Sequence, residues 1–510
     1  MNDSRTKKTA LNVLGGIAVK LSGFLTAFVT RTIFLYVLGI EYAGVSSVFT
    51  NVLTVLSFAE LGIGTAITYA LYKPIAENDE KQIGKLMNAY RKIYTTIAAV
   101  IFLLGLCVLP FMDYIIKDAP SIVEDLRLIY LLYLANTAVS YLLIYKSTFL
   151  VATQKEHLVS KYKIIISLVK TAVECTALLV FKNFIVYLVC SIVISFVQNF
   201  VVAKVAEREY PILKQKCTER LEKAEKKKLF KDTRALAMYK VSGTVLNGTD
   251  SILISSMFGT GNAGILGNYN LITGQVYSFV MVLFGATSAS VGNLAATSDK
   301  EHQYEIFKRM LFICFWLYCF CATSLWVLLN PFMYVWQSGK YIFSELIVAF
   351  LVIEFFLRGM LSPVTQFRTS NGLFVQGRYR PVIMAVINIV TSILFAKWIG
   401  IAGIFLGTIV SRLTTQFWYD PLLIYKRVFN TSVRKYFVTY FIYAIVTVAC
   451  CLSASTLLNL ICPEEGLVKL LVGIALCAVI PNVAVIGCFH RTEAFKGTLK
   501  TIKKVLKRES

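Results

Sequence analysis

Fourteen long apolar segments, separated by short polar breaks, fill the chain from residue 11 to residue 490. The hydrocarbon core of a bilayer is about 30 Å thick, and roughly 20 apolar residues of helix cross it. Only helices and closed barrels satisfy their backbone hydrogen bonds in lipid. The sequence therefore predicts an all-α integral membrane protein whose 14 transmembrane helices cover residues 11–39, 43–72, 90–113, 122–150, 163–181, 183–205, 235–258, 263–293, 307–330, 342–370, 378–398, 401–428, 433–460 and 466–490.

Composition narrows the function classes. Charged residues make up 16% of the chain, against about 25% in a soluble domain. The net charge of +23 would suit nucleic acid only if it formed one basic face, and here it is spread over alternate loops. Most of the 12 cysteines lie within apolar runs and show no CxxC spacing, so we interpret them as small apolar residues and expect no metal site. The apolar stretch at 11–39 is too long for a cleavable signal peptide.

The basic residues also predict the orientation of the chain. If the N-terminus is cytoplasmic, 40 of the 52 Lys and Arg residues fall in inner segments and 6 fall in outer segments. Positive residues are retained on the cytoplasmic side, so both termini are expected there. The longest inner segment, residues 206–234, and the tail, residues 491–510, are predicted to be a basic cytoplasmic linker and a basic cytoplasmic tail.

An internal repeat divides the predicted helices. Two motifs recur 220 or 221 positions apart: Gly39, Ala43 and Gly44 as Gly259, Ala263 and Gly264, and Pro110, Phe111 and Met112 as Pro331, Phe332 and Met333. Six helices in each copy imply a parallel repeat, with its pseudo-twofold axis along the membrane normal. We expect an N-lobe at 1–205, the linker at 206–234, a C-lobe at 235–430, two further helices at 431–490 and the tail at 491–510. Two such lobes can rock around a central cavity.

The six Lys and Arg residues that are assigned to neither side lie inside predicted helices, where each costs at least about 2.5–3.5 kcal/mol at the helix centre. The candidates for substrate binding are Lys20, Arg31, Arg412 and Lys146. Lys20 and Arg31 are eleven residues apart and share one helix face, at two depths about 16 Å apart. Both could instead reach opposite membrane surfaces. Lys146 lies near the inner boundary, so it could also snorkel to the headgroups.

The other intramembrane charges have a simpler interpretation. Lys170 and Glu174, and likewise Glu354 and Arg358, are four residues apart and can neutralise each other within a helix. Two further acids, Glu60 and Asp250, could neutralise a cavity cation or bind a coupling H⁺ or Na⁺. A plain interhelical hydrogen bond is the alternative for both acids. No other cofactor is expected.

The first lobe carries a resemblance to a known family. Residues 34–94 contain a short turn with glycine, an acidic LGxG stretch at 60–64 and an IAENDEKQI loop. This pattern resembles the polysaccharide-transporter (Wzx-type) flippases of the multidrug/oligosaccharidyl-lipid/polysaccharide (MOP) superfamily, which share a MATE-like fold. The resemblance implies translocation of undecaprenyl-pyrophosphate-linked oligosaccharide across a bacterial plasma membrane, alongside the polymerase and glycosyltransferases of its pathway. It also implies cavity cations on the first helix, a role that Lys20 and Arg31 fit.

Other functions remain open at this point. A cation-coupled multidrug antiporter of the same superfamily would favour an acidic cavity, whereas buried cations outnumber free acids here. A membrane polysaccharide polymerase generally has a large outer loop, and an acyltransferase needs an embedded histidine. The three histidines all lie in predicted loops or at a helix end, so an enzyme is not expected. A scaffold without transport would not explain the buried charges.

Overall fold

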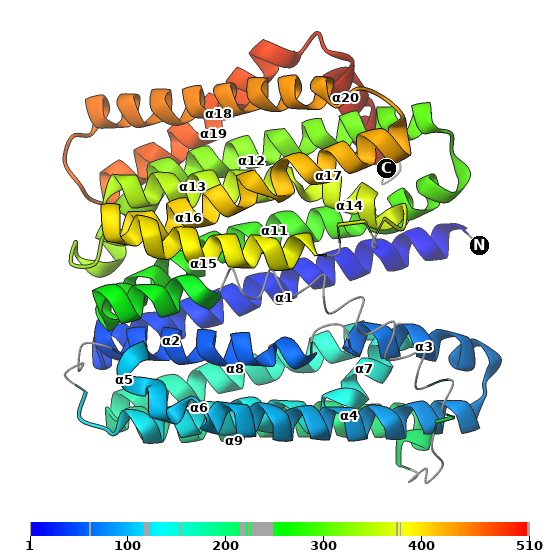
Figure 1. The fold of residues 1–510 in the computed structure, drawn as a ribbon, viewed down its shortest axis with the longest axis vertical. Helices are drawn as coiled ribbons and strands as arrows, with labels where there is room; N and C mark the ends of the chain where they lie inside the picture. The colour runs from blue at the N-terminus through cyan, green and yellow to red at the C-terminus, as the bar shows by residue number, and fades with distance from the viewer. Residues whose placement is uncertain are drawn as a thin grey trace. The chain divides into compact units, whose positions relative to one another are not determined.

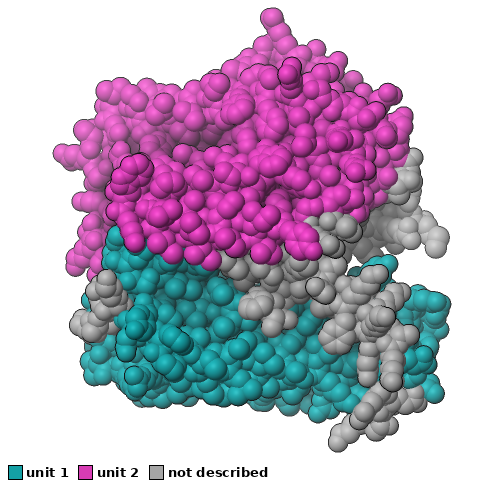
Figure 2. All heavy atoms as spheres, in the orientation of Figure 1, with its two compact units in different colours: residues 1–271 teal, residues 272–510 magenta. Residues whose placement is uncertain are grey.

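The computed structural model describes residues 2–60, 63–116, 122–153, 155–214, 221–222, 225, 248–373, 376–377 and 379–506. Across these ranges the secondary structure is helical and contains no strand, which confirms the all-α fold class. The chain forms two compact units, residues 1–271 and 272–510, coloured separately in Figure 2. We call them unit 1 and unit 2 and describe each by itself.

Unit 1 is a bundle of long helices and short helical turns (Figure 1). Side-chain caps begin several of them: Asp79 accepts from the backbone N–H of Gln82, and Asn183 accepts from that of Val186. Its elements are α1 (Asn2–Val37), α2 (Ile40–Leu56), η1 (Ser57–Glu60), α3 (Ile63–Glu77), α4 (Glu80–Leu106), η2 (Leu109–Phe111), α5 (Met112–Ile115), α6 (Leu126–Tyr141), α7 (Ile144–Ala152), α8 (Glu156–Phe181), α9 (Phe184–Glu209), η3 (Pro211–Lys214), a helical segment at 248–258 and the first turns of α11 (Thr260–Thr297).

Unit 2 contains the rest of α11 and is built around the 38-residue helix α12 (Lys300–Gln337). Helices α13, α18 and α19 all pack against α12, and aromatic rings fill the contacts, for example Phe315 stacked on Tyr443 at 4.0 Å. The remaining elements are α13 (Glu345–Met360), α14 (Ser362–Ser370), α15 (Arg380–Ile399), α16 (Ile401–Thr414), α17 (Gln416–Ile424), a π-helical turn (Tyr425–Phe429), α18 (Arg434–Ile461), α19 (Leu467–Phe489) and α20 (Glu493–Leu506).

Among the described residues, nine helices are long and apolar enough to cross a membrane, or ten if the bent pair α6–α7 is one span. The chain is thus a multi-pass membrane protein. The count is lower than the predicted 14 because several predicted spans are broken: a 3₁₀ turn at Ser57–Glu60 separates α2 from α3, and α16 ends at Thr414 before α17 begins. Hydropathy does not register such breaks. Most of the predicted span at 235–258 lies outside the described residues.

The internal repeat is visible in the backbone. Helices α6 and α13 end at Tyr141 and Met360, 219 positions apart, and a second short helix follows each break. Gly39 and Gly259, which are repeat equivalents, both adopt a positive φ, 91° and 92°. This conformation favours glycine because it has no Cβ. The two copies of the sequence therefore fold through the same local turns.

Two other repeat equivalents lie against each other inside unit 1. A Cβ on Gly264 would lie 2.6 Å from the carbonyl oxygen of Ile40 and 2.9 Å from the backbone nitrogen of Gly44. A Cβ on Gly44 would overlap the carbonyl of Thr260. Small residues allow helix backbones to approach this closely in membranes. Helices α2 and α11 thus meet backbone to backbone.

The predicted lobe boundaries stay a prediction, since most of 206–234 lies outside the described residues.

Candidate functional site

Unit 1 contains a cavity of about 400 Å³ between α1, α2, α8, α9 and the beginning of α11. Its wall is rich in hydroxyl groups and includes two cationic side chains and one carboxylate. The residues that line it are Thr26, Ala27, Thr30, Arg31, Phe34, Ser46, Ser47, Ser167, Lys170, Thr171, Glu174, Tyr187, Ser191, Gly267 and Leu271. Three residues that the sequence singled out, Arg31, Lys170 and Glu174, therefore share one site.

Arg31 is held by α11 through uncharged groups. Its Nε donates to Oδ1 of Asn268 at 2.7 Å, and its Nη2 donates to the carbonyl oxygen of Gly264 at 3.1 Å. Within the described ranges, no carboxylate lies within ion-pair distance of this guanidinium. Its positive charge is therefore available to an anionic ligand, and the planar, forked donor geometry of arginine suits phosphate oxygens.

A glycine makes room for this arrangement. A Cβ on Gly267 would lie 3.0 Å from Nη2 of Arg31 and 2.5 Å from Oγ of Ser47. Any larger residue at 267 would push the guanidinium or the serine away. The close approach of α11 thus positions Arg31 beside the hydroxyl of Ser47, in the wall of the cavity.

Lys170 and Glu174 face the same cavity from α8. The ammonium of Lys170 lies 3.7 Å from Oε1 of Glu174 and donates to Oγ of Ser195 at 3.2 Å. Glu174 is only 5% exposed, whereas the Lys170 side chain is 31% exposed. The long ion-pair distance and the exposure of Lys170 leave its ammonium accessible. With Arg31, these groups give the cavity a formal net charge of +1.

The remaining predicted substrate-binding cations of unit 1 do not line this cavity. Lys20 is exposed on α1. Lys146 on α7 forms an ion pair with Glu207 of α9, and Glu207 also pairs with Lys204 at 2.9 Å. Lys146 is thus neutralised near the end of α9. Asp250 lies in the helical segment at 248–258, half-buried, and is likewise absent from the cavity wall.

Glu60 lies in the break between α2 and α3, next to a group of tyrosines. Its Oε1 accepts a hydrogen bond from Tyr94 at 3.0 Å, and the Tyr94 ring packs against Tyr90 at 4.7 Å. Tyr90 in turn donates to Thr148 of α7 at 3.1 Å. Glu60 therefore takes part in a hydrogen-bonded network that ties the break in the α2–α3 span to α4 and α7.

In unit 2, the intramembrane cations Arg412 and Arg358 contact side chains of other helices. Arg412 of α16 donates to Oε1 of Glu354 on α13 at 2.6 Å and to Oε1 of Gln416 at 3.1 Å. The guanidinium of Arg358 lies 3.9 Å from the ring centroid of Tyr277. The ion pair expected between Glu354 and Arg358 is therefore replaced by a bond between helices, because α13 and α16 pack together and Arg412 reaches the carboxylate.

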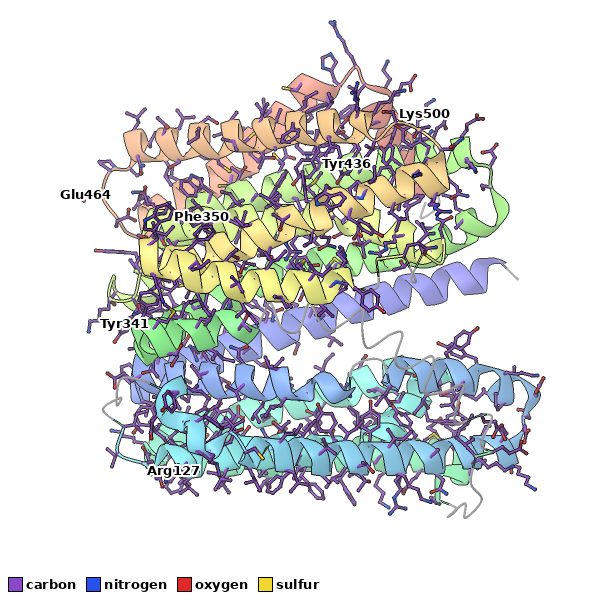
Figure 3. All side chains as sticks on the ribbon, in the orientation of Figure 1. Arg127, Tyr341, Phe350, Tyr436, Glu464 and Lys500 are labelled. Carbon is purple, nitrogen blue, oxygen red and sulfur yellow. The ribbon has the colours of Figure 1, made fainter. Side chains whose placement is uncertain are left out.

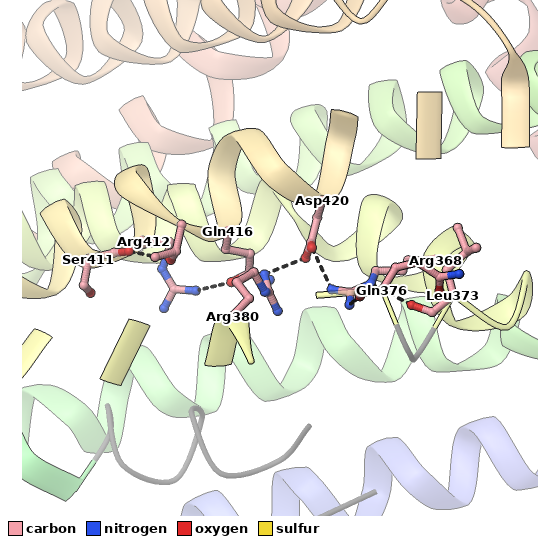
Figure 4. Close-up of polar contacts among 9 residues, drawn as sticks. Arg368, Leu373, Gln376, Arg380, Ser411, Arg412, Gln416 and Asp420 are labelled. Carbon is pink, nitrogen blue, oxygen red and sulfur yellow. Dashed lines mark hydrogen bonds and ion pairs between the residues drawn. The ribbon is translucent and has the colours of Figure 1, made fainter. Parts of the chain in front are cut away.

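The sequence reasoning missed a buried network around Asp420 of α17 (Figure 4). Asp420 is fully buried and pairs with Arg368 at 2.6 Å and with Arg380 at 2.7 Å. Arg368 also donates to the carbonyl oxygens of Leu373 and Gln376. The sequence signal is an acid near the end of an apolar run, but the charge distribution assigns its partners to an inner segment, where no buried pair is expected. This network pairs one carboxylate with two guanidinium groups and joins α14, α15 and α17.

Comparisons with known proteins agree with this architecture. The profile of the family described as "Polysaccharide biosynthesis protein" matches residues 9–291, more than half of the chain, so the protein belongs to that family. This family match confirms the resemblance to polysaccharide transporters that the sequence shows. A comparison with curated protein sequences gives no match.

Solved structures of transporters and of a flippase have a similar fold. The chain is similar to the lipid II flippase MurJ in an inward closed conformation, with a TM-score of 0.65 and 13% identity over 93% of this chain and 100% of that one. It is also similar to a point mutant of the Vibrio cholerae MATE transporter VcmN (TM-score 0.61, 14% identity, 84% and 98% covered). A third similar structure is an inward-facing MATE family transporter of the MOP superfamily (TM-score 0.57, 10% identity, 81% and 98% covered).

Proposed function

We propose that the protein is a flippase that moves a lipid-linked oligosaccharide, with a diphosphate between lipid and sugar, from the inner to the outer leaflet of a bacterial plasma membrane. Family membership and the transporter-like fold support a membrane carrier in polysaccharide biosynthesis. The chemistry of the cavity in unit 1 supports this choice of substrate.

The proposal rests mainly on Arg31, whose guanidinium lines the cavity and is bonded only to uncharged groups among the described residues. An arginine inside a membrane helix normally pairs with an acid or reaches a headgroup. Arg31 instead lines a cavity and is held by an amide and a carbonyl oxygen. Lys170 and several hydroxyls line the same cavity. A diphosphate carries negative charge and many acceptor oxygens, so this wall suits it better than it suits a cation.

The lipid tail needs no protein pocket, because it can remain in the bilayer while the diphosphate and the sugars pass. Alternation between an inward-open and an outward-open state would then complete the transfer. We expect no catalytic step. Undecaprenyl pyrophosphate is the carrier lipid that we propose, and the driving ion that we propose is H⁺ or Na⁺. The cytoplasmic location of both termini follows from the charge distribution and belongs to the same proposal.

A multidrug antiporter is the second candidate, and one observation favours it. Glu174 is buried and faces the same cavity, where it could attract an organic cation. The net positive charge of the cavity argues for the anionic cargo.

A deletion strain distinguishes the two. We expect the strain to accumulate lipid-linked repeat units on the cytoplasmic side and to regain export with the wild-type chain but not with Arg31→Ala. Unchanged surface glycan together with altered dye efflux would point to the antiporter. Full complementation by the double variant Lys20→Ala, Arg31→Ala would defeat the assignment of the site.

A further inference from the structure

A second cavity, of about 190 Å³, lies in unit 2 at the end where α12 and α18 finish and α13 and α19 begin. Figure 3 shows Tyr341 and Glu464, from the two connections at this end, opposite Lys500 of α20. The charge distribution predicts that this end is extracytoplasmic. Its lining shares no residue with the cationic cavity of unit 1.

An unsatisfied donor points to a ligand in this cavity. Trp326 of α12 lines it, and its indole Nε1 is buried without a hydrogen-bond partner among the described residues. The ring of Trp326 packs against the buried cluster of Val327, Ala454, Leu458 and Cys477, which fixes its position. A buried N–H without an acceptor is unfavourable. A ligand hydroxyl would satisfy it.

A proline removes one helical hydrogen bond beside the cavity. Pro331 lies inside α12 and also lines the cavity. Since proline has no N–H, it cannot donate to the carbonyl oxygen of Val327, four residues earlier. Val327 is part of the same wall. Asn459 and Ser455 of α18 add side chains that both donate and accept.

The charges of this cavity exclude a phosphate. Lys469 is 6% exposed, and its Nζ donates to Oε1 of Glu465 at 2.6 Å. Glu345, in the first turn of α13, adds a second carboxylate. The formal net charge is therefore −1, opposite in sign to that of the cavity in unit 1. An anion would be repelled, whereas a neutral ligand would not.

We propose that this cavity binds one neutral sugar ring. Each sugar hydroxyl both donates and accepts, and the wall offers donors from Trp326 and Lys469 and acceptors from two carboxylates and an amide. The faces of Trp326 and Tyr334 offer apolar surface to the C–H groups of the ring. The inference extends the proposed function, since an exported glycan would present such rings at the extracytoplasmic end.

Saturation-transfer NMR on the purified full chain in detergent tests this inference. The probes are glucose, galactose, rhamnose and N-acetylglucosamine, with glycerol and inorganic phosphate as controls. We expect saturable transfer from at least one sugar and none from phosphate. Trp326→Phe removes the indole donor and should weaken binding by about tenfold. Trp398→Phe changes a tryptophan that is 83% exposed on α15 and should leave binding unchanged.

Ser455→Leu is a second test, which keeps the inference falsifiable if the Trp326 variant misfolds. It fills the cavity from a different helix and should abolish binding. The inference is overturned if no sugar shows saturable transfer, or if binding survives both Trp326→Phe and Ser455→Leu. Arg31→Ala should bind sugar normally. Failure of sugar binding with intact export would reject this cavity alone, and failure of export with intact sugar binding would reject the proposed function alone.

Discussion

Arg31 Nε donates a 2.7 Å hydrogen bond to Oδ1 of Asn268, so a cation of α1 is oriented by a neutral amide in the third turn of α11. An aspartate has nearly the same shape as asparagine but carries a negative charge. The residue at position 268 therefore decides whether the guanidinium is free to meet an anion or is already neutralised.

We expect Asn268→Asp to abolish most export while the protein still inserts and folds. The new carboxylate would pair with Arg31 and neutralise the charge that we propose attracts a diphosphate, a change of about tenfold or more if one charge-assisted hydrogen bond is lost. The measurement is accumulation of lipid-linked repeat units in a complemented deletion strain. Asn262→Asp, on the first turn of the same helix and outside the cavity wall, is the matched control. Normal export by Asn268→Asp would contradict the role of Arg31.

Lys170→Ala tests the ion pair in the wall of the cavity. The variant leaves Glu174 buried without its cation, which typically costs about 3–5 kcal/mol for a buried pair. Since Lys170 is partly exposed, we expect the lower end of that range, seen as a lower midpoint of thermal unfolding. The double variant Lys170→Ala, Glu174→Gln should recover most of the stability but not export. Equal stability of the single and double variants would show that the pair contributes nothing.

Asp420→Asn should destabilise unit 2 strongly. It would leave Arg368 and Arg380 buried without their shared carboxylate, and breaking a buried pair costs about 3–5 kcal/mol. Glu77→Gln provides the comparison, because its pair with Lys73 is exposed and such pairs contribute about 0–1 kcal/mol. Thermal unfolding of the two purified variants measures the difference. Similar midpoints for both would mean that the buried network is not structural.

Lys146→Ala should have a mild effect on export, within about twofold of wild type. Glu207 would keep its ion pair with Lys204, so no carboxylate is left uncompensated. The assay is the same complementation by surface glycan. Complete loss of export would show that Lys146 contacts substrate during transport.

Glu60→Gln tests whether this acid carries the coupling ion. Glutamine can still accept the hydrogen bond from Tyr94 but cannot bind a proton or a cation through a charge. We expect transport in proteoliposomes to lose its response to an imposed pH or Na⁺ gradient while the fold is kept. Tyr94→Phe, which keeps the carboxylate, should retain that response. A normal gradient response in Glu60→Gln would leave Glu60 with only a hydrogen-bonding role.

Regular helices were the most predictable part of the fold. The expected spans at 433–460 and 466–490 correspond to Arg434–Ile461 and Leu467–Phe489. Long apolar runs with polar ends fix such boundaries because lipid thickness sets their length. The 3₁₀ turn at Ser57–Glu60 was not predicted, since a local change of hydrogen-bond register leaves the hydropathy of the segment unchanged.

The site was only partly predictable for a related reason. Sequence spacing placed Lys170 beside Glu174 because both lie on one helix, and it marked Arg31 as a buried cation. Sequence spacing could not show that α11 binds Arg31, nor that Glu354 pairs with Arg412 instead of Arg358. Those partners come from other helices, and packing between helices is not encoded in spacing along one of them.

The contact between Gly44 and Gly264 has a mechanical consequence. Most helix pairs interlock, because side chains of one helix fill grooves of the other. Here the backbones of α2 and α11 touch directly at two glycines, without a side chain of either helix between them. A rotation of α2 against α11 about this point would therefore displace few side chains of the two helices. A bulkier residue at either glycine would instead force the helices apart.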